Sequence, residues 1–363
     1  MKEPEIKILN TEGANFEEWK AIIDRLPFKD GLVTAEYASI SKDYYNNEPL
    51  LFVYKEGENF LTYFFIKRRI NSLPFISKND LKEAYFDIIS PEYGGPMGYF
   101  EENVAQEKII SNFFKEFNLF CKKNNIVTEF CRLNPFNPLL NTLVLLGGAE
   151  KNRNLVCIDL KQEKEQIWRN FRKGARCSIK KAQKSGVEIK QEKSKEYIDK
   201  MYEIYTKTMQ RRQALEEYFH SKVFFELLVD RLKDKIELFV ADYKNRIIGS
   251  SLFLVYGDVC HYFFSGTDGD YFNLYPNNLI LNEAIFWAKD KGFKIFHLGG
   301  GYQPNDSLFN FKLSFSKTTA DFYTYSKVHN EDIYKLLCQA KDRHDKLNKE
   351  NNLKPGYFPE YRR

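Results

Sequence analysis

The sequence predicts a mixed α/β fold built from a duplicated unit, in which two largely antiparallel sheets are each flanked by helices. The chain has 363 residues, a length that suits about two domains of roughly 150 residues each. Hydrophobic residues make up 43% and charged residues 29% of the chain, a balance typical of folded rather than disordered proteins. Both halves also show the same order of elements: short strands, a loop, a helix and a final apolar strand.

The first half opens its regular pattern with short apolar runs. Strands are expected over residues 50–54, 60–70, 85–89 and 126–133. A loop rich in Pro and Gly is expected over 90–96. A helix is expected from about 101 to 123, because its Ile and Phe residues recur at the spacing of one helical face.

The second half repeats this order after a helical middle section. Helices are expected over residues 162–184, 196–212, 221–233 and 278–291. Strands are expected over 236–243, 247–256, 259–264 and 293–298. We therefore expect an N-terminal domain over 1–150, a C-terminal domain over 151–330, and a C-terminal helix with a polar tail over 331–363.

Several classes of protein are excluded by composition. No apolar run approaches the roughly 18 residues that a membrane-spanning helix needs, and the N-terminal residues lack the apolar core of a secretory signal. The six cysteines show no C-x-x-C spacing, which argues against a zinc ribbon or a disulfide framework. We expect reduced cysteines, no metal ion and a cytoplasmic protein without a transmembrane segment.

Positive charge is concentrated in the middle of the chain. Residues 151–195 contain 14 Lys and Arg against five Asp and Glu, whereas the whole chain carries a net charge of only +5. Such a local excess attracts anionic partners. Phosphate groups, nucleic acid and an acidic membrane surface all remain open as partners at this point.

Residues 167–184 show an amphipathic pattern at helical spacing. The apolar stripe consists of Ile167, Phe171, Ala175, Ile179 and Ala182, and the opposite stripe of Arg169, Lys173, Arg176, Lys180 and Lys184. A solvated helix face is the simpler interpretation. Phosphate binding is favoured by the lack of acidic i,i+4 partners over 169–184. Arg172 and Arg176 are also one turn apart, which suits two guanidinium forks on one diphosphate.

Three consecutive glycines, Gly299, Gly300 and Gly301, follow the last predicted strand. Glycines at a strand end permit a close backbone approach, and α/β folds place ligands at such ends. Backbone N–H groups here would lie near a reacting carbonyl, although a plain turn is the simpler interpretation. The aromatic residues that follow, Phe309 to Phe315, would anchor the chain and leave Lys312 on the opposite side.

Three segments carry a resemblance to a known family. They are Arg169–Ile189, the motif Phe309-x-Phe311-Lys312-x-x-Phe315, and Tyr85-Phe86-Asp87 with Gly94-Gly95-Pro96. In this order they resemble the patterns R-x-x-I-R-K-A-x-K-x-G-V-x-I, L-Y-x-F-K-x-x-F and Y-x-D-x-x-S-P-x-Y-x-G-G-P of the FemABX family, the Fem-type aminoacyltransferases and their acyltransferase relatives. The resemblance covers roughly residues 30–325.

The resemblance implies two tandem GNAT-like domains, in agreement with the duplicated strand pattern. It also implies that Lys312 lies at the catalytic centre, close to a substrate phosphate and to developing negative charge. A phosphate-binding arginine falls at Arg211 or Arg212, and Lys42 is the nearest match to an N-terminal lysine that contacts the acceptor's diphosphate. The predicted site thus comprises catalytic Lys312, Gly300, Gly301 and Tyr302, and phosphate-binding Arg172, Arg176, Arg211, Arg212 and Lys42.

The chain departs from the family in two places that concern the donor. It has no heptad tract for the coiled-coil arm of many enzymes that use aminoacyl-tRNA, although shorter members lack that arm too. Residues 272–278 stand where a GNAT pyrophosphate loop, Q/R-x-x-G-x-G/A, is expected. A helix N-terminus still binds phosphate through its free N–H groups. We expect no tightly bound cofactor, with acyl-CoA or aminoacyl-tRNA as co-substrate and an acyl carrier protein as a third donor.

We predict an N-acyltransferase that moves an aminoacyl or acyl group from aminoacyl-tRNA or an acyl thioester to an amine of a cell-envelope precursor. The acceptor would be a nucleotide- or lipid-linked sugar or peptide, such as a peptidoglycan intermediate, with peripheral contact to the inner membrane surface. No G-x-S-x-G elbow supports a covalent acyl-enzyme. The proton acceptor stays open among Asp87, Asp268, Asp306, His261 and His297. For His297, a core histidine is the simpler interpretation.

Two alternatives remain. One is a non-catalytic protein on the same scaffold that binds RNA or an anionic surface through the basic segment. Stacking on RNA needs exposed aromatic residues, and only Trp168 and Phe171 lie near the basic residues, with Phe171 on the apolar stripe. The other alternative is a duplicated GNAT-like scaffold that has lost activity.

Overall fold

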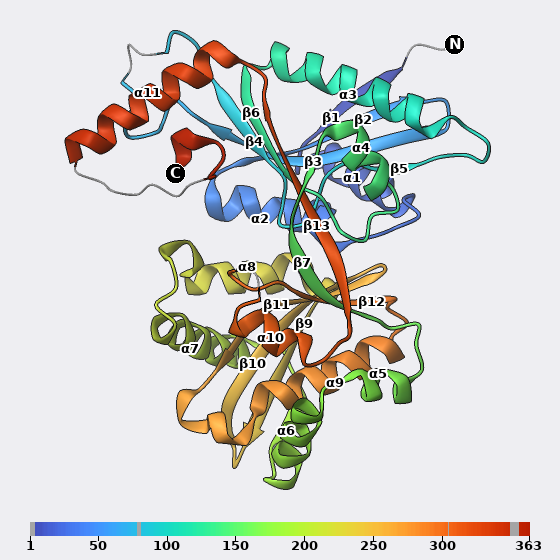
Figure 1. Ribbon diagram of the computed structural model, residues 1–363, viewed down its shortest axis with the longest axis vertical. Helices are drawn as coiled ribbons and strands as arrows, with labels where there is room; N and C mark the ends of the chain where they lie inside the picture. Colours follow the sequence, from blue (N-terminus) through green and yellow to red (C-terminus); the bar gives the residue numbers. More distant parts are fainter. Residues whose placement is uncertain (1–3, 78–80, 304, 349–355) are drawn as a thin grey trace. The chain divides into compact units, whose positions relative to one another are not determined.

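The computed structural model describes residues 4–77, 81–303, 305–348 and 356–363 and divides into two compact units (Figure 1). The first unit consists of Met1–Pro27, Leu32–Asn152 and Phe322–Arg363. The second unit consists of Phe28–Gly31 and Arg153–Asp321. The division at Asn152/Arg153 lies beside the expected boundary at 150/151. None of the described helices is long and apolar enough to cross a membrane.

The first unit is an antiparallel meander followed by a crossover helix and a parallel strand. Its strands, in spatial order, are β1 (Glu5–Leu9), β2 (Glu48–Glu56), β3 (Asn59–Arg69), β4 (Phe86–Ile89), β6 (Ile126–Arg132) and, from Phe322 onward, β13 (Thr318–Val328), with β5 (Met97–Tyr99) beside β3. Its helices are α1 (Gly13–Asp24), α2 (Ala35–Tyr45), α3 (Gln106–Lys123), α4 (Leu140–Gly147) and α11 (Glu331–Asn348). The predicted periodicity of α3 is confirmed, since Ile109, Ile110, Phe113 and Phe117 are buried against the sheet.

The C-terminal segment completes this first unit, which differs from the expected boundaries at 330 and 331. Residues Thr324–Val328 of β13 pair antiparallel with β6, and Leu337 of α11 packs in one apolar cluster with Val127 of β6. These contacts join segments nearly 200 residues apart in sequence. Local sequence pattern carries no signal for such pairing. Residues 349–355 of the expected polar tail lie outside the described residues.

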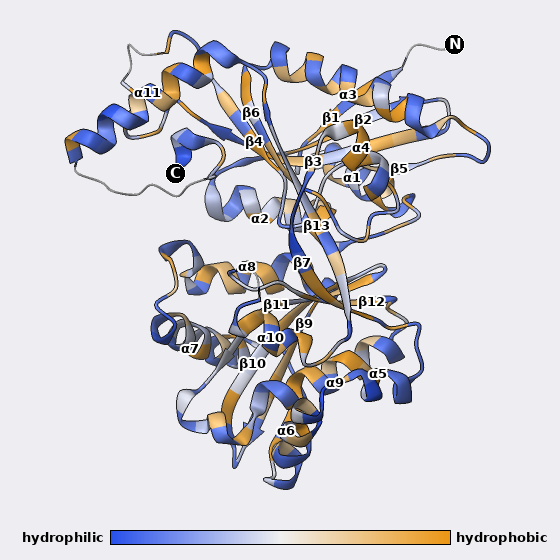
Figure 2. Cartoon of the chain, in the orientation of Figure 1, coloured by the Kyte–Doolittle hydropathy of each residue, from blue (hydrophilic) through white to orange (hydrophobic). Residues whose placement is uncertain are grey.

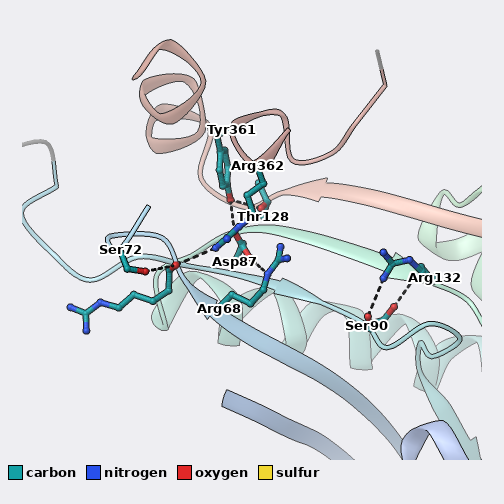
Figure 3. A network of polar contacts seen from close by, with 9 residues as sticks. Arg68, Ser72, Asp87, Ser90, Thr128, Arg132, Tyr361 and Arg362 are labelled. Atoms are coloured by element: carbon teal, nitrogen blue, oxygen red, sulfur yellow. Dashed lines mark hydrogen bonds and ion pairs between the residues drawn. The ribbon is translucent and has the colours of Figure 1, made fainter. Parts of the chain in front are cut away.

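Asp87 on β4 anchors the very end of the chain (Figure 3). Its fully buried carboxylate accepts a hydrogen bond from Arg68 Nε at 2.7 Å, one from Tyr361 Oη at 3.2 Å, and one from Arg362 Nε. The Tyr361 hydroxyl also lies 2.7 Å from Thr128 Oγ1. With two guanidinium partners this carboxylate has a structural role, and it is not placed as the proton acceptor that the sequence allowed.

The second unit repeats the order of the first. Its strands, in spatial order, are β7 (Glu150–Asp159) from Arg153 onward, β12 (Ile295–Gly299), β11 (Val259–Thr267), β10 (Arg246–Tyr256), β9 (Ile236–Tyr243) and β8 (Glu188–Gln191). Its helices are α5 (Lys164–Asn170), α6 (Lys173–Lys184), α7 (Lys195–Arg211), α8 (Lys222–Leu232), α9 (Pro276–Asp290) and α10 (Ser307–Leu313). In each unit a helix connects two parallel strands, β4–α3–β6 and β11–α9–β12. The predicted α/β fold with a duplicated, largely antiparallel unit is confirmed.

The expected helix over 162–184 is two helices. The backbone at Phe171 and Arg172 is extended, and the Arg172 N–H donates to Ser314 O at 2.8 Å instead of closing a helical turn. The apolar stripe is nevertheless buried as predicted, with Ala175, Ile179 and Ala182 of α6 in the core. Helix α6 packs against α9, and hydropathy colouring shows hydrophilic turns on α6 beside the more hydrophobic α9 (Figure 2).

Candidate functional site

The site lies where two parallel strands of the second unit separate. Strands β11 and β12 pair only from Val259–His261 with Ile295–His297. Beyond these pairs β11 continues beside β10 as far as Thr267, whereas β12 ends at Gly299. A register shift between β10 and β11 falls at the same level, at Leu252 and Phe253. Diverging parallel strands expose backbone groups at their carboxyl ends, where α/β folds bind ligands.

Helix α10 brings Lys312 to this point. Asp306 caps the helix by accepting the Phe309 N–H at 2.7 Å, and Phe309 and Phe315 are buried in the core of the unit. Lys312 Nζ donates a hydrogen bond of 2.7 Å to Gly300 O and lies 5.9 Å from the centre of the Tyr262 ring. The prediction that the aromatic residues anchor this segment is met by Phe309 and Phe315, whereas Lys312 follows Phe309 by three positions on the same helix and so shares its face rather than the opposite one.

The Lys312 ammonium is held in an unusual electrostatic state. Burial lowers its pKa to about 8, the Asp306 carboxylate raises it, and the Arg212 guanidinium lowers it. The hydrogen-bond partner of Lys312 Nζ is thus a carbonyl oxygen and not a carboxylate. A carbonyl partner orients an ammonium but does not neutralise it. The site thus presents positive charge that an anionic group can complete.

Asp306 also shapes the segment that follows β12. Its Oδ2 accepts the N–H groups of Tyr302 at 2.7 Å and Gln303 at 3.1 Å, and these bonds lower the pKa of Asp306 although burial opposes them. A Cβ on Gly301 would lie 2.0 Å from Asp306 Oδ1, so a larger residue there would have to displace the carboxylate. The Tyr302 N–H is used by Asp306, and Gly300 faces Lys312 with its carbonyl. The prediction that Gly300, Gly301 and Tyr302 act in catalysis stays a prediction.

Arg153, on β7, is a residue of this site that the sequence did not single out. Its Nη1 donates to Gly301 O at 3.0 Å and to Tyr302 O at 3.3 Å. Together with Asp306 it fixes the backbone of this segment from both sides. Arg153 lies 148 positions from Gly301 in the sequence, whereas Asp306 lies five positions from it. A local sequence motif could therefore include Asp306 but not Arg153.

The adjacent residues Arg211 and Arg212 diverge at the end of α7. Arg211 Nη1 donates to Thr267 O at 3.2 Å, and its guanidinium lies 4.6 Å from the centre of the Phe272 ring. The Arg212 charge instead acts on Lys312 and Tyr262: it adds to the effect of burial in lowering the pKa of Lys312, and it opposes burial, which raises the pKa of Tyr262. Arg212 is therefore the one of the pair that shares the site with Lys312.

The other predicted phosphate-binding residues have different surroundings. The Arg176 guanidinium donates to the carbonyls of Trp168, Arg169 and Phe171 at 2.9 to 3.4 Å and so caps the C-terminus of α5. Arg172 has an exposed side chain, and its backbone N–H joins α6 to the end of α10. Arg176 is thus used within the chain, and phosphate binding by either arginine stays a prediction.

Lys42 belongs to the first unit. It lies in the last turn of α2, is half-exposed, and forms an ion pair with Glu12. A surface ion pair of this kind contributes little to stability. Its predicted contact with a diphosphate is not tested by this arrangement.

The remaining predicted proton acceptors fall into two groups. Asp268 caps the short helix Gly269–Leu274 and pairs with Arg246 at 3.0 Å, so it is a structural residue like Asp306. His261 and His297 are both buried and lie opposite one another in the last pair of the parallel ladder between β11 and β12. Their Nδ1 atoms are 3.0 Å apart. Among the described residues no group of three or more His, Cys, Asp or Glu is arranged to hold a metal ion.

The N-terminus of α9 offers few N–H groups to a pyrophosphate. Its first residue, Pro276, has no N–H, and the N–H groups of Asn278 and Leu279 both donate to Tyr275 O at 3.1 and 3.4 Å. Tyr275 itself has left-handed backbone angles. The sequence that departs from the GNAT phosphate loop thus forms a turn in which two of the first N–H groups of α9 are already bonded to Tyr275 O.

Sequence comparisons fit this architecture. Residues 169–312 match the family described as acetyltransferase (GNAT) domain. A UDP-N-acetylmuramoylpentapeptide-lysine N(6)-alanyltransferase of Weissella viridescens is 28% identical over 170 residues, which cover 44% of this chain and 48% of that relative. The chain thus spans about half the length of the curated relative that it matches.

Solved structures show the same fold. A structure of FemX matches with a TM-score of 0.69 at 13% identity and covers 91% of this chain and 99% of its own. The C-terminal domain of a putative lysylphosphatidylglycerol synthetase from Agrobacterium fabrum matches with a TM-score of 0.52 at 12% identity, covering 92% and 95%. The fold and the comparisons thus define the class, a GNAT-like acyltransferase scaffold. Within that class, the predicted resemblance to the Fem-type aminoacyltransferases of the FemABX family is confirmed.

Proposed function

We propose that this protein is an N-acyltransferase that moves an aminoacyl or acyl group from an activated donor to an amine of a cell-envelope precursor. The observation that carries the proposal is Lys312, a partly buried ammonium oriented by Gly300 O with the charge of Arg212 acting on it. Acyl transfer builds negative charge on the carbonyl oxygen, and a preorganised cation in a water-poor site stabilises that charge. The segment resembling F-K-x-x-F supplies this cation where β11 and β12 separate.

The reaction needs an uncharged amine and an aligned carbonyl. The amine nitrogen attacks the acyl carbon of an ester or thioester, so a C–N bond forms and the C–O or C–S bond breaks. The alcohol or thiol leaves with one proton, and the amine gives up its own. Lys312 supplies positive charge to the oxyanion or to a donor phosphate, and Arg212 adds to the same potential. Arg153 and Asp306 hold the segment beside them.

The α9 turn favours aminoacyl-tRNA over acetyl-CoA as the donor. Acetyl-CoA needs backbone N–H groups for its pyrophosphate at a helix N-terminus, and Pro276, Asn278 and Leu279 reduce that supply. The exposed cations of α6, among them Lys173, Lys180 and Lys184, offer a positive face for a polyanionic donor. The acceptor we propose is a nucleotide- or lipid-linked muramyl peptide, by analogy with the alanyltransferase activity for which the Weissella viridescens relative is named.

The test begins with thermal unfolding of the full chain in the presence of acetyl-CoA, longer acyl-CoAs and UDP-N-acetylmuramoyl pentapeptide. A ligand that binds the folded state raises the midpoint by mass action. Alanyl-tRNA is then added with the muramyl nucleotide, and the product mass is measured. Addition of one aminoacyl group supports the proposal. If a CoA thioester raises the unfolding midpoint and its acyl group is transferred to the acceptor, the donor is an acyl thioester and not aminoacyl-tRNA.

Two lysine variants separate catalysis from binding. Lys312→Ala should lower turnover by about 10² to 10³-fold, the usual cost of removing one group that stabilises an oxyanion, while the muramyl nucleotide still stabilises the fold. Lys317→Ala, an exposed lysine five positions along the chain, is the matched control and should behave as the unaltered protein. A protein that binds RNA but transfers nothing, with or without Lys312, would instead be the non-catalytic alternative.

A further inference from the structure

Three buried titratable side chains form a continuous chain of hydrogen bonds in the second unit. Both carboxylate oxygens of Asp30 lie 2.9 Å from His261 Nε2, and His261 Nδ1 lies 3.0 Å from His297 Nδ1. The exposed fractions of Asp30, His261 and His297 are 0%, 3% and 2%. Burying three such groups is costly unless each is hydrogen-bonded, so a chain of this kind calls for a physical reason.

A short segment from the N-terminal part of the sequence supplies Asp30 to this chain of hydrogen bonds. The four residues Phe28–Gly31 belong to the second unit, although the segments before and after them belong to the first. They are held by two backbone contacts with Asp258: the Lys29 N–H donates to its carboxylate and Lys29 O accepts its N–H, both at 3.1 Å. Gly257 permits this approach, because a Cβ there would lie 2.3 Å from Lys29 Cβ. The result is that Asp30 reaches His261.

The hydrogen bonds fix the tautomers. A carboxylate only accepts, so His261 Nε2 carries a hydrogen toward Asp30. When His261 is neutral its Nδ1 then has the lone pair, and His297 must donate from its own Nδ1. His297 Nε2, on the far side of that ring, consequently holds a lone pair. His297 Nε2 is therefore the nitrogen that can accept a proton from a group other than Asp30 and His261.

Among these three hydrogen-bonded residues, His297 is the one whose pKa is affected by the charge of the proposed catalytic Lys312. Burial lowers the pKa of His297 well below its usual value, and the charges of His261 and Lys312 lower it further. Arg212 on α7 and Asp306 on α10 in turn act on Lys312. A positive charge is therefore disfavoured on His297 itself. On His261 the same charge would lie against the Asp30 carboxylate.

We propose that Asp30, His261 and His297 form a proton relay that takes up the proton released by the attacking amine. The inference rests on the proposed acyl transfer and names its proton acceptor. His297 accepts the proton at Nε2, directly or through one water, and passes its Nδ1 proton to His261 Nδ1. His261 becomes an imidazolium paired with the Asp30 carboxylate, and His297 stays neutral. His297 is the catalytic base, and His261 and Asp30 are positioning residues that act through it.

The first test is spectroscopic and needs no substrate. The chain has five histidines, so ¹⁵N labelling of histidine in the full-length protein gives few signals, which His261→Gln and His297→Gln variants assign. At the pH of highest activity we expect His297 to be neutral with its hydrogen on Nδ1 and His261 to carry its hydrogen on Nε2. A neutral His297 with its hydrogen on Nε2 would overturn the relay, because its accepting nitrogen would already be occupied.

The second test is the pH profile of kcat/KM for Asp30→Asn. The relay accepts a proton only while it is unprotonated, so activity falls as pH drops through its apparent pKa. Loss of the carboxylate makes the relay less basic, and the acid limb should move to lower pH by about one unit or more while the plateau falls. The matched control is Glu129→Gln in the first unit, where Glu129 Oε2 lies 3.0 Å from His329 Nε2 in a buried pair.

The two variants separate a relay from a structural network. A lower melting temperature in both variants, with the acid limb displaced only in Asp30→Asn, supports the relay. An unmoved acid limb in Asp30→Asn would overturn it, whatever happens to stability. If the unaltered protein transfers no acyl group at all, the proposed function fails, and the tautomers of His261 and His297 still decide on their own whether the chain of donors runs as described.

Discussion

Lys312 Nζ and Gly300 O are 2.7 Å apart, and this single hydrogen bond joins α10 to the segment after β12. A carbonyl oxygen accepts from an ammonium as well as from a neutral amine's N–H, so the contact keeps the side chain in place in both protonation states. The charge of Lys312, unlike its position, is therefore controlled by its surroundings. Burial and Arg212 favour the neutral amine, and Asp306 favours the ammonium.

The alkaline side of the activity profile should report this lysine. Burial lowers the pKa of Lys312 to about 8, so the ammonium predominates below pH 8 and is lost above it. If the charge stabilises the transition state, kcat/KM falls as pH rises through about 8. A bound anionic substrate favours the ammonium, so the limb in kcat should lie at higher pH than the limb in kcat/KM.

Lys312→Arg provides the check on that assignment. Arginine keeps its charge throughout the measured range, so the alkaline limb should disappear even if the altered geometry lowers the overall rate. The measurement is kcat/KM from pH 6 to 10 for both proteins. If kcat/KM of the arginine variant falls at the same alkaline pH as that of the unaltered protein, the limb belongs to a group other than Lys312.

The neighbouring arginines should differ in their effect on the same profile. The Arg212 charge lowers the pKa of Lys312, so Arg212→Gln should move the alkaline limb to higher pH. The displacement should be a fraction of a pH unit, because Arg212 is exposed and its charge is screened. Arg211→Gln is the control, since Arg211 contacts Thr267 O and the Phe272 ring instead. Equal displacement in both variants would contradict the divergence of the two side chains.

Gly301 and Asp306 should be energetically coupled. Gly301→Ala places a Cβ only 2.0 Å from Asp306 Oδ1. The collision displaces the carboxylate from the Tyr302 and Phe309 N–H groups. Asp306→Ala removes the same bonds, including a helix cap usually worth about 1 kcal/mol. In the double variant the collision is absent, so its loss of unfolding free energy and of kcat/KM should be smaller than the sum of the single losses.

The control for this cycle is a pair of residues that are not in contact. Gly174→Ala, with no heavy atom within 4 Å of the added Cβ, should combine additively with Asp306→Ala. Additive losses for Gly301→Ala and Asp306→Ala as well would mean that the carboxylate does not pack on Gly301 in solution.

Much of the fold follows from periodicity that is local in the sequence. The apolar spacing of α3 and the buried stripe of α6 are local features, and both were predictable. The break between α5 and α6 was not, because Arg172 there gives its N–H to Ser314, 142 residues further along. A helical wheel considers only neighbouring residues, so it does not detect a partner this far away. The apolar stripe also keeps its helical spacing from α5 into α6, so the pattern shows no sign of the break.

The site divides in the same way. Lys312 and the glycines were accessible because motif residues lie within a few positions of one another. Two contacts in this unit are remote in sequence: Arg153 lies 148 positions from its partner Gly301, and Asp30 lies 231 positions from its partner His261. Nothing in the local sequence around Asp30 distinguishes it from other aspartates, so its contact with His261 is found only in the folded structure.

The end of the chain should contribute more to stability than its short 3₁₀ helix suggests. Asp87→Ala removes a fully buried carboxylate and leaves Arg68 and Arg362 without their shared partner (Figure 3), a change that usually costs about 3 to 5 kcal/mol. Arg362→Ala should cost less, because Arg68 still pairs with Asp87. The control is Asp290→Ala, whose ion pair with Lys164 is exposed on both sides and should add little to stability. Urea unfolding of the four proteins measures the difference, and equal midpoints for Asp87→Ala and Asp290→Ala would show that this buried network does not stabilise the first unit.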